Sequence, residues 1–339
     1  MQRVAIVGAG NMGRVHGAAY REMLNAEPVA VVDIRPDAAE ELATSLDCRS
    51  FTDFDEMLRT ANPDVIDICA PTPWHKEYVL RAAEAGKHVI TEKPMARTLD
   101  DCRRMIDAIE RAGVTFMVAH VLRFFPEFAA AKAHIDAGAV GKPAIVRTTR
   151  GGGYPHAWND WFGNFDWSGG VVLDLMIHDF DWLRWTFGEV ERVYAKGLAG
   201  RGTEHMDYAL VTIRFKSGVI AHVEGTWMNP TGFTVKFEVA GDGGMLDFSN
   251  KAAAPLVIAR LRAEAFGGGP RTKTEGEKPG VAIPESPTMQ NPYFLELQHF
   301  IDCVESGAKP SITPEDGLRA VEIALAALES IRTGKPVNL

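Results

Sequence analysis

Over roughly the first 120 residues, short apolar runs alternate with segments whose apolar residues recur at helical spacing. Strands that are apolar throughout are typical of a sheet buried on both faces. Strands and helices in strict alternation therefore predict a parallel, doubly wound α/β sheet. The expected strands cover 3–7, 29–33, 65–69, 88–91 and 115–119, and the expected helices cover 12–25, 36–46, 74–86 and 98–112.

After about residue 125 the pattern changes to longer segments in which apolar and polar residues alternate, separated by glycine-containing turn signals. Such segments predict an open, mostly antiparallel sheet. One helix is expected at 169–187, and a closing helix at 315–332 has Thr313 as its N-cap and Gly334 just past its end. The expected strands cover 143–150, 190–199, 206–215, 219–227, 233–241 and 244–249.

We therefore predict a Rossmann domain over residues 1–122 and an α+β domain over 123–339, and the composition of 46% apolar and 24% charged residues is ordinary for such domains. With 36 Lys and Arg against 45 Asp and Glu, the net charge of −9 gives no general attraction to nucleic acid or anionic lipid. No apolar stretch approaches the ~20 residues of a membrane span, and the N-terminus does not resemble a signal peptide. We expect a cytoplasmic protein without nucleic-acid or membrane partners.

Two further features concern metals and irregular segments. The four cysteines, Cys48, Cys69, Cys102 and Cys303, are widely separated, so they predict neither a zinc site nor a disulfide framework, and we expect no bound metal. The segment 266–292 is rich in Gly, Pro and charge and has no periodicity. A lid, an oligomer arm and an excursion without function are all consistent with it.

A glycine-rich turn directly after the first strand predicts a dinucleotide site. In G-x-G-x-x-G turns the glycines admit a tight bend and a close pyrophosphate, which the N-terminus of the following helix attracts. Asp33 follows Gly13 by twenty residues, where a carboxylate binds ribose hydroxyls and repels a 2′-phosphate, so we expect NAD rather than NADP. Arg35 could instead bind the 2′-phosphate of NADP. The alternative to a dinucleotide site is a glycine turn that serves only the packing of the helix on the strand. The turn residues are Gly8, Gly10, Asn11, Met12 and Gly13.

Further candidates follow from the rule that ligands bind beyond the carboxyl ends of parallel strands. Most residues at these ends are expected to contact the cofactor: Thr72, Trp74, His75, Glu92, Lys93 and His120. Arg123 also lies at such an end, and we assign it to the substrate. His75 could equally lie on the surface. Four aromatic or imidazole side chains follow the glycine run 151–153, namely Tyr154, His156, Trp158 and Trp161, and Tyr293 precedes a later helix. These five side chains could line a sugar pocket or belong to the core.

The expected helix 169–187 carries Asp174 and His178 four residues apart, which places them one turn apart on one face together with Asp181. A carboxylate there could orient and charge-stabilise the imidazole. Histidine suits proton transfer from a hydroxyl whose carbon loses hydride, and Lys93 could donate to the developing alkoxide. A structural His–Asp pair is the alternative.

Three stretches, GAGNMGRVH, PTPWHKEYVLRAAEAGKHVITEKP at 71–94 and GGVVLDLMIHDFDWLRW at 169–185, resemble the Gfo/Idh/MocA oxidoreductase family, and the closing helix is similar as well. The resemblance implies a Rossmann domain joined to an open sheet and oxidation or reduction of sugars, inositols and related polyols. It also implies catalytic roles for Lys93, Asp174 and His178, with His178 as general acid and base. Within the family the run 173–181 most resembles inositol 2-dehydrogenases.

Two other functions remain open within this resemblance: a glycosidase that retains NAD while it oxidises and re-reduces its sugar, and a ligand-sensing regulator without catalysis. The intact Lys93, Asp174 and His178 argue against the regulator. The second domain has too few expected helices to cover both faces of its sheet, so we expect a homo-oligomer, and the family resemblance suggests a dimer or tetramer.

Overall fold

The computed structural model describes residues 1–199, 206–229, 232–251, 256–260, 281–283 and 291–339. Its N-terminal part is a six-stranded parallel sheet in the order β3-β2-β1-β4-β5-β6, which confirms the predicted doubly wound fold. The short β3 and the helix after it were not predicted. The strands are β1 (Gln2–Val7), β2 (Ala26–Val32), β3 (Arg49–Phe51), β4 (Val65–Ile68), β5 (His88–Glu92) and β6 (Phe116–Ala119).

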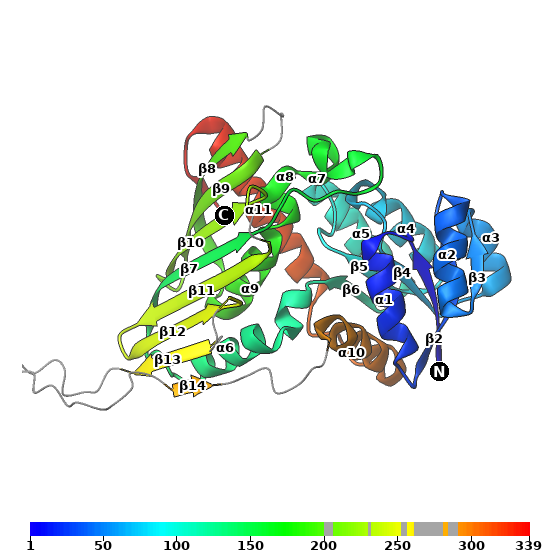
Figure 1. Cartoon of the computed structure of the whole chain (residues 1–339), viewed down its shortest axis with the longest axis horizontal. Helices are drawn as coiled ribbons and strands as arrows, with labels where there is room; N and C mark the ends of the chain where they lie inside the picture. The colour runs from blue at the N-terminus through cyan, green and yellow to red at the C-terminus, as the bar shows by residue number, and fades with distance from the viewer. Residues whose placement is uncertain (200–205, 230–231, 252–255, 261–280, 284–290) are drawn as a thin grey trace, which may run out of the picture.

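Helices lie on both faces of this sheet (Figure 1). They are α1 (Asn11–Arg21), α2 (Pro36–Leu46), α3 (Phe54–Ala61), α4 (His75–Glu84) and α5 (Leu99–Ala112), with a 3₁₀ turn, η1 (Thr72–Trp74), before α4. A second 3₁₀ turn, η2 (Val121–Phe124), leads into α6 (Pro126–Asp136), a helix that the sequence did not indicate.

The second sheet has nine strands in the order β14-β13-β12-β11-β7-β10-β9-β8-β15. All described pairs are antiparallel except β7 with β10, so the predicted mostly antiparallel sheet is confirmed. Most of the segment 266–292 lies outside the described residues. The strands are β7 (Pro143–Gly151), β8 (Val190–Ala199), β9 (Met206–Phe215), β10 (Ile220–Thr226), β11 (Thr234–Gly241), β12 (Gly244–Ser249), β13 (Leu256–Arg260), β14 (Val281–Ile283) and β15 (Val337–Asn338).

The predicted single helix at 169–187 is wrong, because the chain forms two helices there. These are α8 (Gly170–Asp174) and α9 (Ile177–Phe187), preceded by η3 (Trp158–Gly163) and α7 (Phe165–Ser168). The closing helix α11 (Pro314–Thr333) agrees with its sequence signals: Thr313 and Asp316 form a reciprocal capping box, and Gly334 ends the helix in a left-handed conformation.

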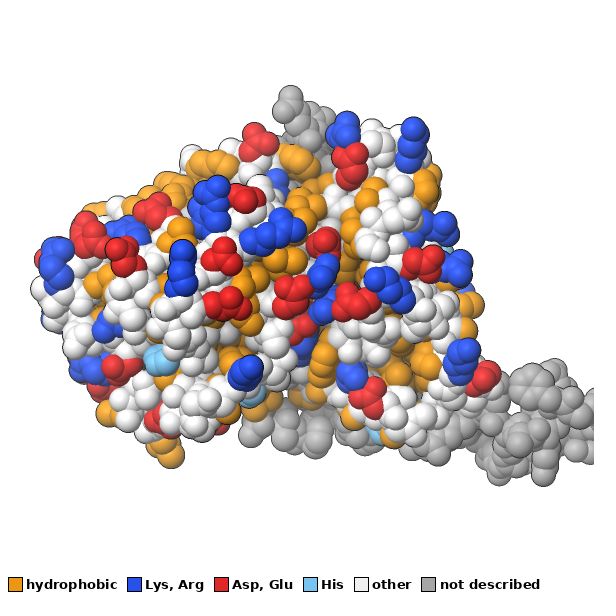
Figure 2. All heavy atoms as spheres, turned by 180° about the vertical axis from the view of Figure 1, so that it is seen from behind, with side chains coloured by type: hydrophobic (Ala, Val, Ile, Leu, Met, Phe, Trp, Pro, Cys, Tyr) orange, Lys and Arg blue, Asp and Glu red, His pale blue; other side chains and the backbone are white. Residues whose placement is uncertain are grey.

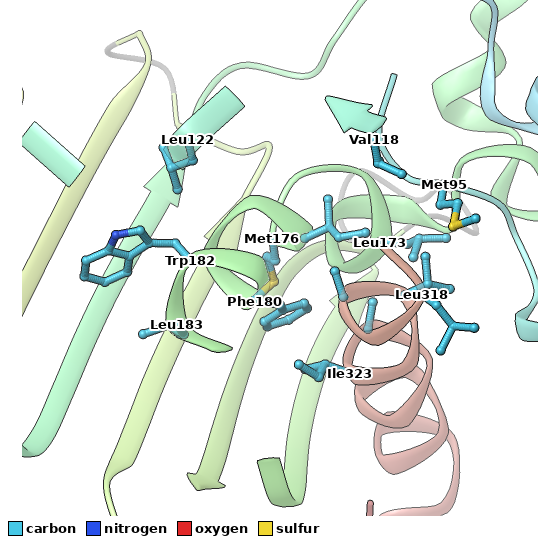
Figure 3. Close-up of a cluster of buried hydrophobic side chains, with 14 of the residues drawn as sticks. Met95, Val118, Leu122, Leu173, Met176, Phe180, Trp182, Leu183, Leu318 and Ile323 are labelled. Atoms are coloured by element: carbon cyan, nitrogen blue, oxygen red, sulfur yellow. The ribbon is translucent and has the colours of Figure 1, made fainter. Parts of the chain in front are cut away.

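One continuous hydrophobic core joins the two sheets through α8, α9 and α11. Figure 3 shows Met95 and Val118 of the N-terminal part beside Leu173 and Leu318, and Met176 beside Phe180. Five of the side chains in this view have less than 1% of their surface exposed: Met95, Val118, Leu173, Met176 and Phe180. The segment that carries Asp174 and His178 is therefore held from both sides.

The helix α10 (Pro292–Ser306) packs against α1, although it follows the second sheet in sequence. Leu297, Phe300 and Ile301 belong to the same buried cluster as Val4 and Ile6 of β1.

Acidic and basic side chains are interspersed over the face seen in Figure 2. Among the described helices, none combines the length and the apolar character that a membrane crossing requires.

Candidate active site

A cavity of about 630 Å³ lies at the carboxyl ends of the parallel strands, with walls from both parts of the chain. It brings together residues predicted separately from the glycine turn, the strand ends, the aromatic segment and the helix at 169–187. The predicted residues that line it are Gly8, Gly10, Asn11, Met12, Asp33, Arg35, Thr72, Trp74, Glu92, Lys93, His156, Trp158, Trp161, Asp174, His178 and Tyr293. Sequence reasoning missed Arg14, Ile34, Cys69, Tyr78 and Phe162 in its walls.

Five predicted site residues do not line the cavity. Gly13 packs against the backbone carbonyl of Gly8 within the glycine turn. The buried ring of His75 contacts the carbonyl oxygens of Ala70 and Pro94, at 2.7 and 2.9 Å, so it supports the backbone. His120 is fully buried, and neither of its ring nitrogens has a partner among the described residues.

The other two are Arg123 and Tyr154. Arg123 is not free to bind substrate, because its buried guanidinium donates to both carboxylate oxygens of Asp181, at 2.6 and 2.8 Å. The Tyr154 hydroxyl contacts Asp160 at 3.3 Å, and its ring lies against Trp227.

The glycine turn has the shape that a dinucleotide requires. Gly8 has a φ of 106°, and a Cβ there would meet backbone of Cys69 and Ala70 at 2.8 Å. A Cβ on Gly13 would lie 1.9 Å from the Gly8 carbonyl oxygen, so only glycine lets α1 pack this closely on the turn. A Cβ on Gly10 would meet nothing within 4 Å, which leaves its backbone open to a ligand. These residues fit a pyrophosphate at the N-terminus of α1.

Asp33 lies at the end of β2, where its carboxylate accepts hydrogen bonds from Ala9 N–H at 2.8 Å and from the Arg35 side chain at 2.9 and 3.0 Å. Burial alone would raise the pKa of Asp33, but the hydrogen bonds from Arg35 and Ala9 outweigh it and lower that pKa. A carboxylate that is charged at neutral pH and lies beside the glycine turn suits ribose hydroxyls and opposes a 2′-phosphate.

We expect the protein to bind NAD more tightly than NADP, and Asp33→Ser to reduce this preference by about 10- to 100-fold. The substitution removes the charged acceptor and frees Arg35 for a phosphate, and hydrogen bonds to a charged group contribute ~1.5–3 kcal/mol. Titration of both cofactors, followed by fluorescence of the reduced forms, measures the ratio of Kd values.

Arg35→Ala is the matched control, since it keeps the carboxylate and should preserve the preference for NAD. Equal or tighter binding of NADP by the unchanged protein would contradict the role of Asp33 and make Arg35 the phosphate ligand.

Lys93 follows β5 and reaches the C-terminal end of α8. Its ammonium donates to the Asp174 backbone carbonyl at 2.8 Å and to the Asp174 carboxylate at 3.2 Å. The peptide bond between Lys93 and Pro94 is cis. Asp174 therefore pairs with Lys93, and the predicted pairing of Asp174 with His178 is wrong, because the helix breaks between these two residues.

His178 lies in the first turn of α9, and among the described residues its buried Nδ1 has no hydrogen-bond partner. Burial lowers the pKa of His178 well below the ordinary value, and the charges of Lys93 and Arg150 lower it further. The imidazole is therefore neutral at pH 7.

Two buried ion pairs hold α9 directly after His178. Asp179 accepts from Arg150 of β7 at 2.6 and 3.3 Å, and Asp181 accepts from Arg123. Sequence reasoning noted Asp181 only as a neighbour of His178 and missed Arg150 and Asp179. Because a buried charge without its partner is costly, these pairs fix the orientation of the helix.

A buried polar cluster lies behind the cavity wall, centred on His16 of α1. His16 Nδ1 contacts the Asp67 carboxylate at 2.8 Å, and His16 Nε2 lies 3.4 Å from the Glu92 carboxylate. The Glu92 carboxylate also accepts a hydrogen bond from the backbone N–H of Lys93 at 2.9 Å. Burial alone would lower the pKa of His16, but Asp67 and Cys69 raise it well above its ordinary value. The charged imidazole thus links the helix of the glycine turn to the strand end that carries Lys93.

The same cluster has the composition of a metal site, since ligand atoms of His16, Asp67 and Cys69 lie within 4.8 Å of one another. These atoms already contact one another, at 2.8 Å between His16 and Asp67 and 3.3 Å between His16 and Cys69.

Two family models match the chain. A model described as an oxidoreductase family with an NAD-binding Rossmann fold matches residues 2–120, and a GFO/IDH/MocA C-terminal domain matches residues 128–247. The N-terminal part is thus an NAD-binding Rossmann domain.

Similar proteins cover almost the whole chain. The scyllo-inositol 2-dehydrogenase (NAD(+)) of Bacillus subtilis is 31% identical over 99% of this chain and 96% of its own length. The myo-inositol 2-dehydrogenase of Thermotoga maritima is 29% identical over 99% of this chain and 98% of its own length. Among solved structures, a levoglucosan dehydrogenase in complex with NADH has a TM-score of 0.87 at 26% identity and covers 99% of this chain and 98% of that one.

Proposed function

Because the chain belongs to the Gfo/Idh/MocA family of oxidoreductases, we propose that it is an NAD-dependent dehydrogenase that oxidises a hydroxyl-bearing carbon of a cyclic polyol or sugar. One observation carries the proposal: the Lys93 ammonium and the His178 imidazole line the same cavity as the dinucleotide turn. The names of the similar inositol and levoglucosan dehydrogenases support the substrate class.

The proposed roles follow from charge and burial. The neutral His178 accepts the hydroxyl proton during oxidation and returns it in the reverse direction. Lys93 donates a hydrogen bond to the oxygen as negative charge develops there, and Asp174 holds the ammonium in place through its carboxylate and its backbone carbonyl. Bound NAD would supply the hydride acceptor, while the protein supplies orientation and proton transfer.

A panel of inositols, aldoses and anhydrosugars tests the proposal, with added NAD and absorbance of NADH as the readout. We expect NADH to accumulate with at least one cyclic polyol or sugar. Hydrolysis of a glycoside without net NADH would indicate instead a glycosidase that retains its NAD. Tight binding of NAD and sugar without any turnover would indicate a regulator.

We also propose that the protein is a homo-oligomer assembled through the second sheet. Its helices α9 and α11 lie on the side toward the Rossmann domain (Figure 1). On the opposite side, cross-strand pairing aligns Ile220, Ile145 and Met245 in one row, and each is about 40% exposed. An apolar row of this kind on a sheet face is typical of an interface between subunits.

We expect light scattering at micromolar concentration to give a multiple of the 37.1 kDa chain mass. Combined Ile145→Glu and Ile220→Glu substitutions should shift the mass toward one chain, because they place like charges at the centre of the proposed interface. Leu24→Glu, at an exposed turn, is the control and should leave the mass unchanged. A mass near 37 kDa for the unchanged protein would refute the proposal.

A further inference from the structure

The segment 155–161 of the second domain crosses to the Rossmann side of the cavity. Its residues Pro155, His156, Trp158 and Trp161 line the same cavity as the glycine turn. The Trp158 ring lies with its centroid 6.0 Å from the Arg35 guanidinium carbon, and 40% of its surface is exposed. Trp158 therefore faces the end of β2, although the sequence assigned it to the substrate.

The two ends of the cavity have different chemistry. Lys93, Asp174 and His178 form the reacting end, where a nicotinamide and a substrate must meet. Asp33 and Arg35 form the nucleoside end, because the carboxylate after the second Rossmann strand binds the adenosine ribose. The contact with Arg35 places Trp158 at the nucleoside end.

The distance between Trp158 and Arg35 indicates that they do not stack tightly on each other. Flat groups in contact lie about 3.5–4.0 Å apart, so the observed 6.0 Å exceeds direct stacking. A flat base between two faces needs about 7 Å. A shift of about 1 Å would therefore admit a purine ring between them, and an aromatic face with a nearby guanidinium is a usual platform for a base.

The backbone around Trp158 is arranged to present its ring. Asn159 and Asp160 have left-handed φ angles of 54° and 44°, which are costly for residues with a Cβ and are best tolerated by Asn and Asp. Asp160 N–H donates to the Ala157 carbonyl at 3.1 Å, and the Asp160 carboxylate accepts from the Tyr154 hydroxyl. Tyr154 in turn packs on Trp227 at the end of β10, so this turn is anchored to the second sheet.

The base of the segment is also tied to the Rossmann domain. Trp167 of α7 packs edge-on against Trp74, with ring centroids 5.0 Å apart. Arg97 donates to the Asp166 backbone carbonyl at 2.9 Å. The turn that carries Trp158 is thus supported from both domains and stays close to Arg35.

We propose that Trp158 binds the cofactor rather than the substrate, by stacking on the adenine ring of NAD beside Arg35. The second domain then contributes to both ends of the cavity, with His178 at the reacting end and Trp158 at the nucleoside end.

Binding of cofactor fragments tests this proposal. In Trp158→Ala we expect the Kd values of NADH and ADP-ribose to rise by about 10-fold, the order expected for loss of one base–aromatic stack. Reduced nicotinamide mononucleotide, which lacks adenosine, should bind the variant and the unchanged protein equally. Trp158→Phe should restore most of the affinity, because it keeps an aromatic face. Calorimetry measures all three ligands without turnover.

Trp161→Ala is the matched control, since Trp161 lines the same cavity but stacks on Phe162, with ring centroids 3.9 Å apart. It should leave the ADP-ribose Kd nearly unchanged. The proposal is overturned if Trp158→Ala leaves the Kd of ADP-ribose unchanged. It is also overturned if the substitution raises the Kd of reduced nicotinamide mononucleotide as much as that of ADP-ribose. A change confined to the substrate KM would also overturn it and restore Trp158 to the substrate site.

Discussion

His178→Ala is expected to lower kcat for polyol oxidation by about 100- to 10,000-fold, the usual contribution of a general acid or base. The reason is that His178 is the neutral imidazole at the reacting end of the cavity. NAD should bind the variant with nearly unchanged Kd, because the glycine turn and Asp33 lie at the other end. Stopped-flow measurement of NADH formation and a separate NAD titration check the two parts.

His134→Ala is the control, because His134 lies on α6 and does not line the cavity. Added imidazole should restore part of the turnover of His178→Ala, since a small base can enter the space left by the side chain. Near-normal oxidation by His178→Ala at every pH would refute the proposed mechanism and leave His178 with a packing role.

Lys93→Met is expected to lower kcat and to move the rising limb of the pH profile for oxidation to higher pH. Burial is the largest cause of the low pKa of His178, and the Lys93 ammonium is the next. Without this positive charge the imidazolium is less disfavoured, so the pKa of His178 rises toward its ordinary value. The base form, which oxidation requires, then appears only at higher pH. The pH dependence of kcat/KM measures the shift.

Lys93→Arg separates charge from position, because it keeps the positive charge but changes the reach and shape of the donor. It should lower kcat while leaving the rising limb near its original pH. A rising limb at the same pH in Lys93→Met, or one at lower pH, would contradict the electrostatic coupling of Lys93 and His178.

Local signals predicted the parts of the structure that local interactions decide. The glycine turn was recognised because a strand precedes it and a helix follows it, and Thr313 with Asp316 marked the start of α11. The strand-end rule then put Asp33 and Lys93 at one cavity, since the carboxyl ends of parallel strands lie together. His178 reaches the same cavity from α9 of the second domain, which the strand order does not predict.

Contacts between side chains that tertiary packing decides could not be predicted from local sequence patterns. The pairing of Asp174 with His178 assumed one regular helix, but the Met176 N–H bonds the Val171 carbonyl, five residues back, and this wider turn moves His178 off the Asp174 face. A Cβ on Gly225 would meet Met176 at 2.3 Å, so tertiary packing of Met176 against β10 accompanies the break.

Arg123 was assigned to the substrate for a similar reason. Its position after β6 suggests an exposed strand end, but its guanidinium forms a buried ion pair with Asp181, 58 residues later in the sequence. Trp158 shows the same limit, because its neighbour Arg35 lies on another domain. No spacing along the chain reveals either contact.

The packing of α10 has a consequence for exchanging parts between proteins of this kind. Leu297, Phe300 and Ile301 cover residues of α1 and β1, so a fragment that stops at residue 122 would expose the apolar surface that they bury. A chimera that takes its cofactor specificity from one parent and its substrate specificity from another must therefore be spliced at two points. The helix Pro292–Ser306 has to be transferred together with the strand β1 and the helix α1 that it covers.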